Sequence, residues 1–221
     1  MCLICQRIEL IKAGDNPYFV KELETGYLVI GDHQYFEGYS LFLAKEHVTE
    51  LHHLKKETRL RFLEEMSLVQ EAVAKTFAAE KMNIELLGNG DAHLHWHLFP
   101  RRRGDMNGHG LKGRGPVWWV PFEEMTAETC QAKPDEIERL VKRLSSELDK
   151  LLENSDKQCI RILTRGITMT SEAKIDLELD EPNANDNLYD VDGYKIIINK
   201  VKILKIYERK MKNTIYKVFF F

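Results

Sequence analysis

Three histidines, His93, His95 and His97, alternate with apolar residues near the middle of the chain. Side chains two residues apart in a β-strand lie on the same face, so this spacing predicts three imidazoles in one row. The residues between them, Leu94 and Trp96, would then point toward a core on the other face. Two kinds of chemistry use such a row: metal binding and nucleophilic catalysis.

The spacing of residues along one strand is unfavourable for binding a metal ion with that strand alone. Alternate residues of a strand are about 6.5–7 Å apart, whereas two nitrogens on one Zn²⁺ must lie within about 3.3 Å of each other. A neutral imidazole, in contrast, attacks phosphorus well near neutral pH, because its pKa is close to that pH. Flanking imidazoles can orient its tautomer and neutralise charge on phosphoryl oxygens. His95 has a neighbour on both sides and is therefore the predicted nucleophile.

A Cys-x-x-Cys pair, Cys2 and Cys5, stands at the N-terminus. Four cysteines are too few for a disulfide scaffold in a chain of 221 residues. The pair therefore indicates a metal site or redox chemistry, and a structural zinc needs four sulfur or nitrogen ligands. The other two cysteines, Cys130 and Cys159, are expected to be small apolar residues.

The elements that must position these residues follow from hydrophobic periodicity. Apolar residues recur every three to four positions in two stretches, and shorter apolar runs bounded by turn residues indicate strands. Helices are predicted over residues 56–81 and 134–153, and strands over Tyr27–Ile30, Tyr39–Leu43, Ile84–Leu87 and His93–Phe99, the last ended by Pro100.

The segment Arg101–Gly115, which is rich in glycine and charge, is expected to be an exposed, mobile loop. Arg101, Arg102 and Arg103 at its start fit electrostatic steering of a nucleotide better than nucleic-acid binding. Trp118 and Trp119 follow, and packing is favoured for them over stacking on a base.

The composition changes after Asn154, and a domain boundary is predicted near residues 153–157. Beyond it, β-like runs occur at Ile160–Leu163, Ile175–Leu179 and Tyr194–Ile198. Asp192-Gly193 before the last run is a strong signal for a β-hairpin.

Composition excludes several classes of protein. The 32 Lys and Arg residues against 35 Asp and Glu give a net charge of −3, which argues against nucleic-acid binding through a general basic field. No run approaches the ~20 apolar residues of a transmembrane helix, so no membrane association is expected. The N-terminal residues, with Glu9 inside their only apolar stretch, are not expected to form a secretory signal. A cytoplasmic protein is expected.

The segment His93–Phe99 matches, at every position, the signature His-φ-His-φ-His-φ-φ (φ apolar) of the histidine-triad (HIT) family, which the sequence therefore resembles. Leu43–Leu51 is similar to the family's strand-to-helix segment, with Ala44 where Pro is common. The resemblance covers about residues 1–153. It implies an α+β fold with a HIT-type antiparallel sheet and two main helices, and a homodimer.

The resemblance also implies site residues. His95 attacks an α-phosphorus, His97 binds a phosphoryl oxygen, and the carbonyl of His93 holds the Nδ1 proton of His95. Asn89 stands where the family often has Gln and is either a phosphate or leaving-group donor or a plain turn residue. Asp32 matches the acidic position that binds ribose hydroxyls, or is only part of a Gly-Asp turn.

The sequence differs from the family pattern at two places, and both differences affect the choice of substrate. Gly38-Tyr39 replaces a common Gly-His pair, which leaves one imidazole fewer to support the triad. Asp91-Ala92 replaces a more usual hydrophobic spacer before the first histidine.

By resemblance to zinc-containing HIT proteins and galactose-1-phosphate uridylyltransferase, a structural zinc is expected on an N-terminal Cys pair, an upstream His and the first triad His. These are Cys2, Cys5, His47 and His93 here. Residues 157–221 weakly resemble the β-rich HesB/IscA-like domain but lack its iron–sulfur cysteines, so a small β-rich domain of unknown role is expected.

The implied function is a nucleotide hydrolase that cleaves dinucleoside polyphosphates of the diadenosine tetraphosphate type, or nucleoside phosphoramidates, through a nucleotidyl-histidine intermediate. Three alternatives stay open: a nucleotidyltransferase using an acceptor other than water, a nucleotide-binding regulatory protein, and a zinc-binding interaction protein.

Overall fold

The computed structural model describes residues 2–157, 159–165, 174–191 and 194–199. It divides the chain into two compact units, Met1–Leu151 and Leu152–Phe221, and each is described by itself. Three features of the sequence lie outside the described residues: the glycine turn at 166–170, the Asp192-Gly193 turn and the tail from 200 to 221.

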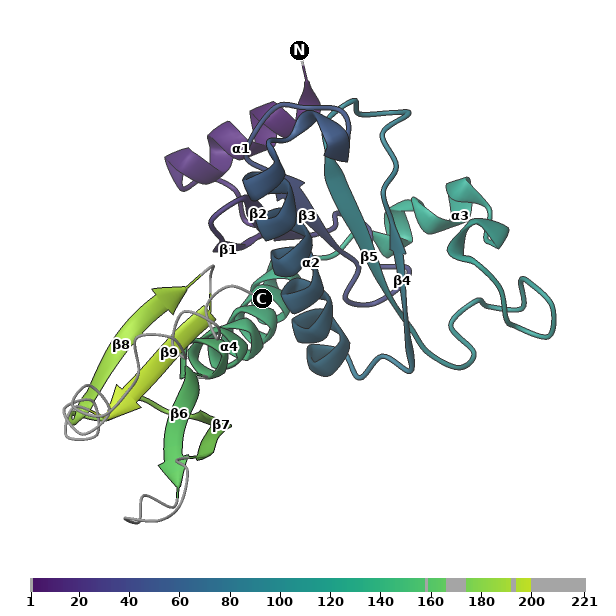
Figure 1. The fold of residues 1–221 in the computed structure, drawn as a ribbon. Coiled ribbons are helices and arrows are strands. Elements are labelled where there is room, and N and C mark those ends of the chain that lie inside the picture. The colour runs from purple at the N-terminus through teal and green to yellow at the C-terminus, as the bar shows by residue number, and fades with distance from the viewer. Residues whose placement is uncertain (1, 158, 166–173, 192–193, 200–221) are drawn as a thin grey trace, which may run out of the picture. The chain divides into compact units, whose positions relative to one another are not determined.

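The first unit is built on a five-stranded antiparallel sheet in the order β1-β2-β3-β5-β4 (Figure 1). Its strands are β1 (Phe19–Glu22), β2 (Gly26–Ile30), β3 (Ser40–Ala44), β4 (Lys81–Glu85) and β5 (His95–Arg101). The predicted α+β fold with an antiparallel sheet is confirmed.

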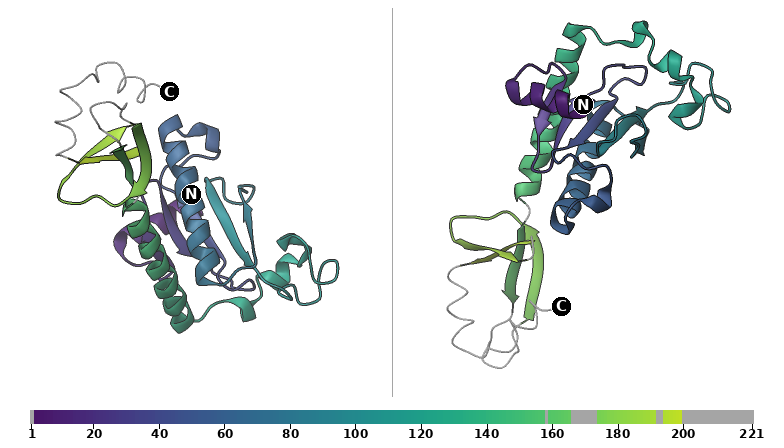
Figure 2. Two further views of the ribbon diagram at one scale, coloured as in Figure 1. Left: turned by 60° about the horizontal axis from the view of Figure 1, so that its bottom comes forward. Right: turned by 90° about the horizontal axis from the view of Figure 1, so that it is seen from above.

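Helices pack on both faces of this sheet. The apolar side of α1 (Leu3–Ala13), which includes Ile4 and Ile8, packs on Tyr27 and Val29 of β2. The long helix α2 (Lys56–Thr76) packs on the other face, where Phe62 stacks on Phe42. Helix α4 (Pro134–Lys157) lies beside α2, as Figures 1 and 2 show, and begins at the predicted proline.

Short helices fill the connections. They are α3 (Phe122–Met125) and the 3₁₀ turns Leu51–His53, Val117–Trp119 and Glu128–Cys130. Among the described residues, no helix is both long enough and apolar enough to cross a membrane.

Several predicted boundaries were wrong. The strand predicted at Ile84–Leu87 begins and ends earlier, at Lys81 and Glu85. Helix α2 ends at Thr76, not near residue 81, because Ala78 takes a left-handed φ of 49° and Lys81 already begins β4. Strand β5 passes through Pro100 to Arg101 instead of stopping before the proline. Beyond Leu98 this strand pairs with β4 alone, and a proline is tolerated where one side of a strand is unpaired.

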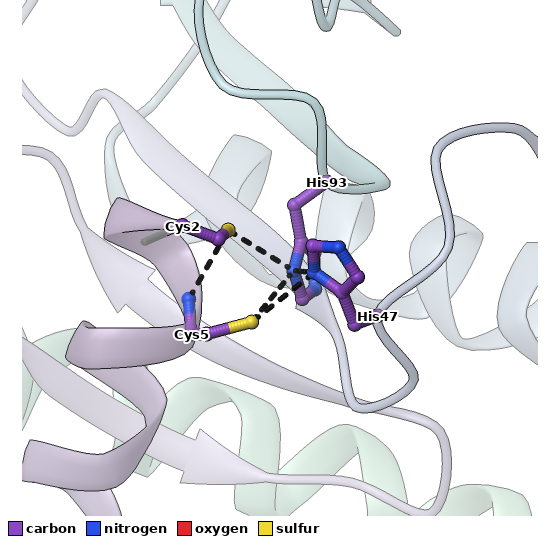
Figure 3. Close-up of side chains that lie close together, drawn as sticks. All are labelled: Cys2, Cys5, His47 and His93. Carbon is purple, nitrogen blue, oxygen red and sulfur yellow. Dashed lines mark hydrogen bonds between the residues drawn. The ribbon is translucent and has the colours of Figure 1, made fainter.

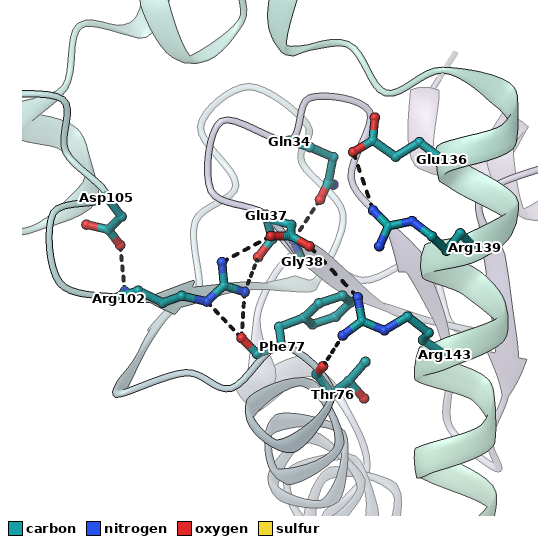
Figure 4. Close-up of polar contacts among 10 residues, drawn as sticks. All are labelled: Gln34, Glu37, Gly38, Thr76, Phe77, Arg102, Asp105, Glu136, Arg139 and Arg143. Atoms are coloured by element: carbon teal, nitrogen blue, oxygen red, sulfur yellow. Dashed lines mark hydrogen bonds and ion pairs between the residues drawn. The ribbon is translucent and has the colours of Figure 1, made fainter.

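One acidic side chain ties the ends of several elements together. Glu37, in the β2–β3 connection, bonds Arg102 after β5 (Nη1 to Oε2, 3.3 Å) and lies 3.8 Å from Arg143 of α4 (Figure 4). Arg143 also donates to the carbonyl of Thr76 at the end of α2 (2.7 Å). These contacts fix the end of the sheet from which the loop after β5 emerges.

The second unit contains four strands in the order β7-β6-β9-β8: β6 (Cys159–Arg165), β7 (Lys174–Asp180), β8 (Asp186–Val191) and β9 (Tyr194–Asn199). The predicted hairpin is confirmed, since Val191 of β8 pairs with Tyr194 of β9. Buried Arg161 donates to both carboxylate oxygens of Asp186 (2.7 and 2.8 Å). The unit is β-rich, as expected.

Candidate active site and metal centre

Only two of the three motif histidines share a strand face. His95 and His97 lie in β5 with ring centroids 4.6 Å apart. His93 precedes the strand, where its N–H donates to the carbonyl of Asp91 in a turn (2.7 Å), and its buried side chain joins another cluster. The predicted single row is therefore wrong at its first member, because the period of two applies only where the strand has begun.

His95 has the tautomer that a nucleophile needs. Its Nδ1–H donates to the backbone carbonyl of His93 at 2.5 Å. With the proton held there, Nε2 keeps its lone pair. The ring is 5% exposed, and the residue lines a cavity. This is the arrangement expected for His95 and the His93 carbonyl.

That cavity, called the triad cavity below, has a volume of about 390 Å³. Aromatic and aliphatic side chains form most of its wall, from Val29 and Leu41 on the sheet to Phe36, Phe99, Trp118 and Phe122. Its polar side chains are Arg7, Asp32, His33, Tyr35, Tyr39, Asp91, His95, His97 and Thr126. An apolar pocket with a few convergent polar groups is typical of a small-ligand site.

His97 is held as a neutral ring. Burial and the neighbouring His95 lower the pKa of His97 to about 4, so the imidazole ring is uncharged at neutral pH. Its Nδ1 lies 2.6 Å from the hydroxyl of Tyr39. Tyr39 stacks on Phe99 with ring centroids 4.4 Å apart, and burial raises the pKa of its hydroxyl. We expected this position to lack a supporting imidazole, and a phenol contacts the triad there instead.

Asp32 lies in the cavity wall but already has a partner. Both of its carboxylate oxygens accept from the guanidinium of Arg7 in α1, one of them at 2.7 Å from Nη1. Sequence reasoning missed Arg7, and no motif marks it: it reaches the site only because α1 packs beside the cavity.

The structure does not bring Asn89 into the triad cavity. Its side chain is exposed in the turn before His93, and the nearby residue that does line the cavity is Asp91. The predicted contact of Asn89 with a phosphate or leaving group stays a prediction.

The four predicted metal ligands meet in one place. Cys2 and Cys5 come from the start of α1, His47 from the loop after β3 and His93 from the segment before β5 (Figure 3). All four ligand atoms lie within 4.8 Å of one another. Cys5 Sγ is 3.2 Å from His47 Nδ1 and 3.5 Å from His93 Nδ1, and the two Nδ1 atoms are 3.2 Å apart.

The shortest of these separations are close to those around a tetrahedral zinc, and the widest would have to close when an ion binds. With bonds of about 2.3 Å to sulfur and about 2.0–2.1 Å to nitrogen, ligand atoms lie about 3.3–3.8 Å apart. His93 also has the supporting contact expected of a ligand, because its Nε2 lies 2.9 Å from the carbonyl of Ala44. A proton on Nε2 leaves Nδ1 free for the metal, and burial lowers the pKa of His93, which favours the neutral ring that binds metals.

Comparisons with known proteins find a family match over part of the chain and similar folds. Residues 20–104 match the HIT domain model. The fold is similar to a histidine triad protein from Sinorhizobium meliloti 1021 (22% identity, 63% of this chain, 93% of that chain, TM-score 0.50). It is also similar to a Zn-bound histidine triad family protein from Mycobacterium smegmatis (22% identity, 69% and 96%, TM-score 0.48). Among curated proteins, no relative is found.

Proposed function

Since residues 20–104 match the HIT domain model, we propose that the protein is a nucleotidyl hydrolase or transferase with His95 as its nucleophile. The hydrogen bond from His95 Nδ1 to the carbonyl of His93 is the observation that carries this proposal. It leaves the Nε2 lone pair unprotonated beside a cavity of about 390 Å³.

In the first step, His95 Nε2 attacks the α-phosphorus of a bound nucleotide. A P–N bond forms, and the bond from phosphorus to the leaving group breaks, with its electron pair leaving on that group. The Nδ1 proton stays on His95, where the His93 carbonyl stabilises the positive charge that develops on the ring.

In the second step, water attacks the same phosphorus and the P–N bond breaks. The electron pair returns to Nε2, and one proton of the water passes to solvent or to the departed group. A transferase differs only in the acceptor, which replaces water here. Hydrolysis and transfer therefore need the same residues of this chain.

His97 supplies a hydrogen bond rather than a charge. The ring is neutral because its pKa is about 4. When Tyr39 donates to Nδ1, the ring proton is on Nε2 and can donate to a phosphoryl oxygen as negative charge grows there.

Asp32 and Arg7 are proposed to meet the nucleoside end of the substrate. Asp32 can accept from ribose hydroxyls while Arg7 holds its carboxylate in place. Dinucleoside polyphosphates and nucleoside phosphoramidates are the proposed substrates. A homodimer is proposed as the assembly, which sedimentation analysis tests.

Cys2, Cys5, His47 and His93 are proposed to hold one zinc ion. The ion would supply a structural crosslink between the start of α1 and the segment before β5. The side chains of these four residues are assigned to the metal and not to the substrate. His93 contributes to catalysis through its carbonyl, whose position depends on where its side chain is held.

The test is turnover of a panel of adenylated compounds by the wild type, His95→Asn and a control, His52→Asn. His52 is an exposed histidine outside the cavity. We expect His95→Asn to lose about four to six orders of magnitude in kcat, as when other enzymes lose their nucleophile. Binding of the nucleotide should remain, and the control should match the wild type.

Equal turnover by His95→Asn would refute the assignment of the nucleophile. Binding of nucleotides or zinc without turnover of any compound would favour a regulatory or zinc-binding interaction protein over an enzyme.

A further inference from the structure

A second cavity, larger than the first and called the basic cavity here, lies between β4, the end of β5 and the loop after it. Its volume is about 1040 Å³. Eight charged side chains line it, six basic and two acidic: Lys81, Arg101, Arg102, Arg103, Lys112 and Arg114 against Glu80 and Asp105. This concentration of positive charge stands out in a chain whose net charge is −3.

The basic cavity and the triad cavity lie along the same face of the sheet. His97, Phe99 and Arg101 alternate in β5 and therefore point to one side. His97 and Phe99 line the triad cavity, and Arg101 lines the basic cavity. The segment from Gly115 to Trp118 connects the two walls, since its first residue lines the basic cavity and its last the triad cavity.

Two of the arginines that we expected to steer a nucleotide are structural. Arg101 is buried and donates to Asp105, to Asn83 Oδ1 (2.8 Å) and to the carbonyl of Gly115 (2.9 Å). Arg102 donates to the carbonyl of Phe77 and to Glu37 (Figure 4). The loop is consequently fastened to the sheet at both of its ends. The expected mobility of the residues between them stays a prediction.

Four cations remain for a ligand: Lys81, Arg103, Lys112 and Arg114. Each is exposed, and their side chains make no hydrogen bond or ion pair with another described residue. Lys112 and Gly113 both have left-handed φ angles, 55° and 71°, in a tight turn closed by Leu111 and Arg114. A lysine with such a φ is strained, and strain of this kind concentrates at functional sites.

The triad cavity itself offers little attraction for a polyanion. Its carboxylates, Asp32 and Asp91, outnumber its one arginine, Arg7, and His97 is neutral. Glu85, which is opposite His97 on β4, adds a carboxylate bonded to Trp118 Nε1 (2.5 Å). Electrostatic attraction for a phosphate chain must therefore come from residues outside the triad cavity. The nearest group of positive charges along β5 is the basic cavity.

We propose that the basic cavity is the leaving-group subsite, which binds the distal phosphates of a nucleotide whose α-phosphorus lies at His95. This inference rests on the proposed function and narrows its substrate class. His97 and Arg101 are about 14 Å apart along β5. An extended polyphosphate chain carries its negative charge from the triad toward the cations, and their long side chains cover the remaining distance, whereas a small uncharged leaving group offers them no charge. Dinucleoside polyphosphates are therefore the preferred substrates.

The experiment compares the double variant Lys112→Glu/Arg114→Glu with a matched control, Lys55→Glu/Lys56→Glu. Both pairs are exposed, and each substitution changes the charge equally. kcat/KM is measured for diadenosine tetraphosphate and for an adenosine phosphoramidate with an uncharged amine. We expect the test variant to lose about tenfold or more on the tetraphosphate, with a weaker salt dependence, and to match the wild type on the phosphoramidate. The control should change neither.

Binding of inorganic tripolyphosphate, measured by calorimetry on the full chain, separates this inference from the proposed function. Binding by the wild type that the test variant loses supports the subsite even if no compound is turned over. Equal binding by both proteins, or an equal loss on both substrates, overturns it. A selective loss on a 5′-adenylylated oligonucleotide, with the tetraphosphate unaffected, also overturns it and assigns the cavity to nucleic acid.

Discussion

Two neighbouring imidazoles on β5 each have one partner at Nδ1, a backbone carbonyl for His95 and a phenol for His97. The His93 carbonyl accepts from Nδ1 of His95, so that ring keeps its Nε2 lone pair. Tyr39 lies 2.6 Å from Nδ1 of His97 and is the only hydrogen-bond partner of that atom among the described residues. Burial raises the pKa of this phenol, so it keeps its proton at neutral pH, and when it donates to Nδ1 the His97 proton is on Nε2. One ring is then a nucleophile and the other a donor.

Removal of the Tyr39 hydroxyl tests this assignment. Tyr39→Phe keeps the ring that stacks on Phe99 but loses one hydrogen bond, which is worth about 1 kcal/mol or about fivefold in rate. We expect kcat to fall by that factor with little change in KM, and the ¹⁵N shifts of His97 to show a mixture of tautomers. Tyr39→His should restore part of the loss. Tyr35→Phe, a control in the same cavity wall, should leave the His97 shifts unchanged, and identical shifts in Tyr39→Phe would rule out the role of Tyr39.

The low pKa of His97 also makes stability depend on pH. The folded protein resists protonation of this ring until about pH 4, whereas the unfolded chain takes up the proton near pH 6.5. The unfolded state therefore binds more protons in this range, and the free energy of unfolding falls as the pH drops from 6.5 to 4. The contribution of His97 is at most about 3 kcal/mol.

Urea unfolding at several pH values, for the wild type and His97→Gln, measures this contribution. We expect the variant to lose stability less steeply between pH 6.5 and 4. Other groups that titrate in this range, including the zinc ligands, are common to both proteins and cancel in the difference. The same slope for both proteins would contradict the low pKa.

At the scale of elements, α1 depends on its N-terminal contacts. A helix of 11 residues is marginal by itself in water. Its apolar side packs on β2, and its first turn carries two of the four proposed zinc ligands. Arg7, one turn further on, reaches Asp32 only if the helix keeps this position. The metal centre and the wall of the triad cavity are thus connected through one short helix.

Loss of a ligand should therefore affect more than metal content. We expect Cys5→Ser to bind less than one equivalent of zinc and to increase amide exchange over α1 by at least about tenfold. kcat/KM should fall as well, because the Arg7–Asp32 pair is disturbed. Cys130→Ser, a cysteine outside the cluster, is the matched control. Full zinc occupancy in Cys5→Ser, or unchanged exchange over α1 without zinc, would contradict this connection.

The elements show what periodicity can and cannot predict. Alternating residues were sufficient to find β5, and three-to-four spacing to find α2 and α4. The first residue of β5 was not predictable, because it depends on pairing with β3, which reaches only from Ser40 to Leu43. For the same reason, the sequence could not predict that His93 lies before β5 and apart from the other two histidines. Arg7 carried no signal, since its contact with the site arises from the packing of α1. Tyr39 was marked only as a departure from a common Gly-His pair, and its contact with His97 could not be predicted from that.

At the scale of the whole molecule, all residues of the triad cavity, the metal centre and the basic cavity belong to the first of the two compact units. We therefore propose residues 1–153 as the catalytic domain. Residues 157–221 stay a separate domain of unknown role, and their likeness to a HesB-type domain stays a prediction. Chemistry at the triad should accordingly be measurable on the full chain without any partner for the second unit.

The most direct measurement is mass spectrometry of the full chain, quenched rapidly after it is mixed with diadenosine tetraphosphate. The protein should gain the mass of one AMP moiety, peptide mapping should place that group on His95, and water should remove it at the rate of turnover. Turnover without an adduct, or an adduct on any other residue, would contradict nucleophilic attack by His95.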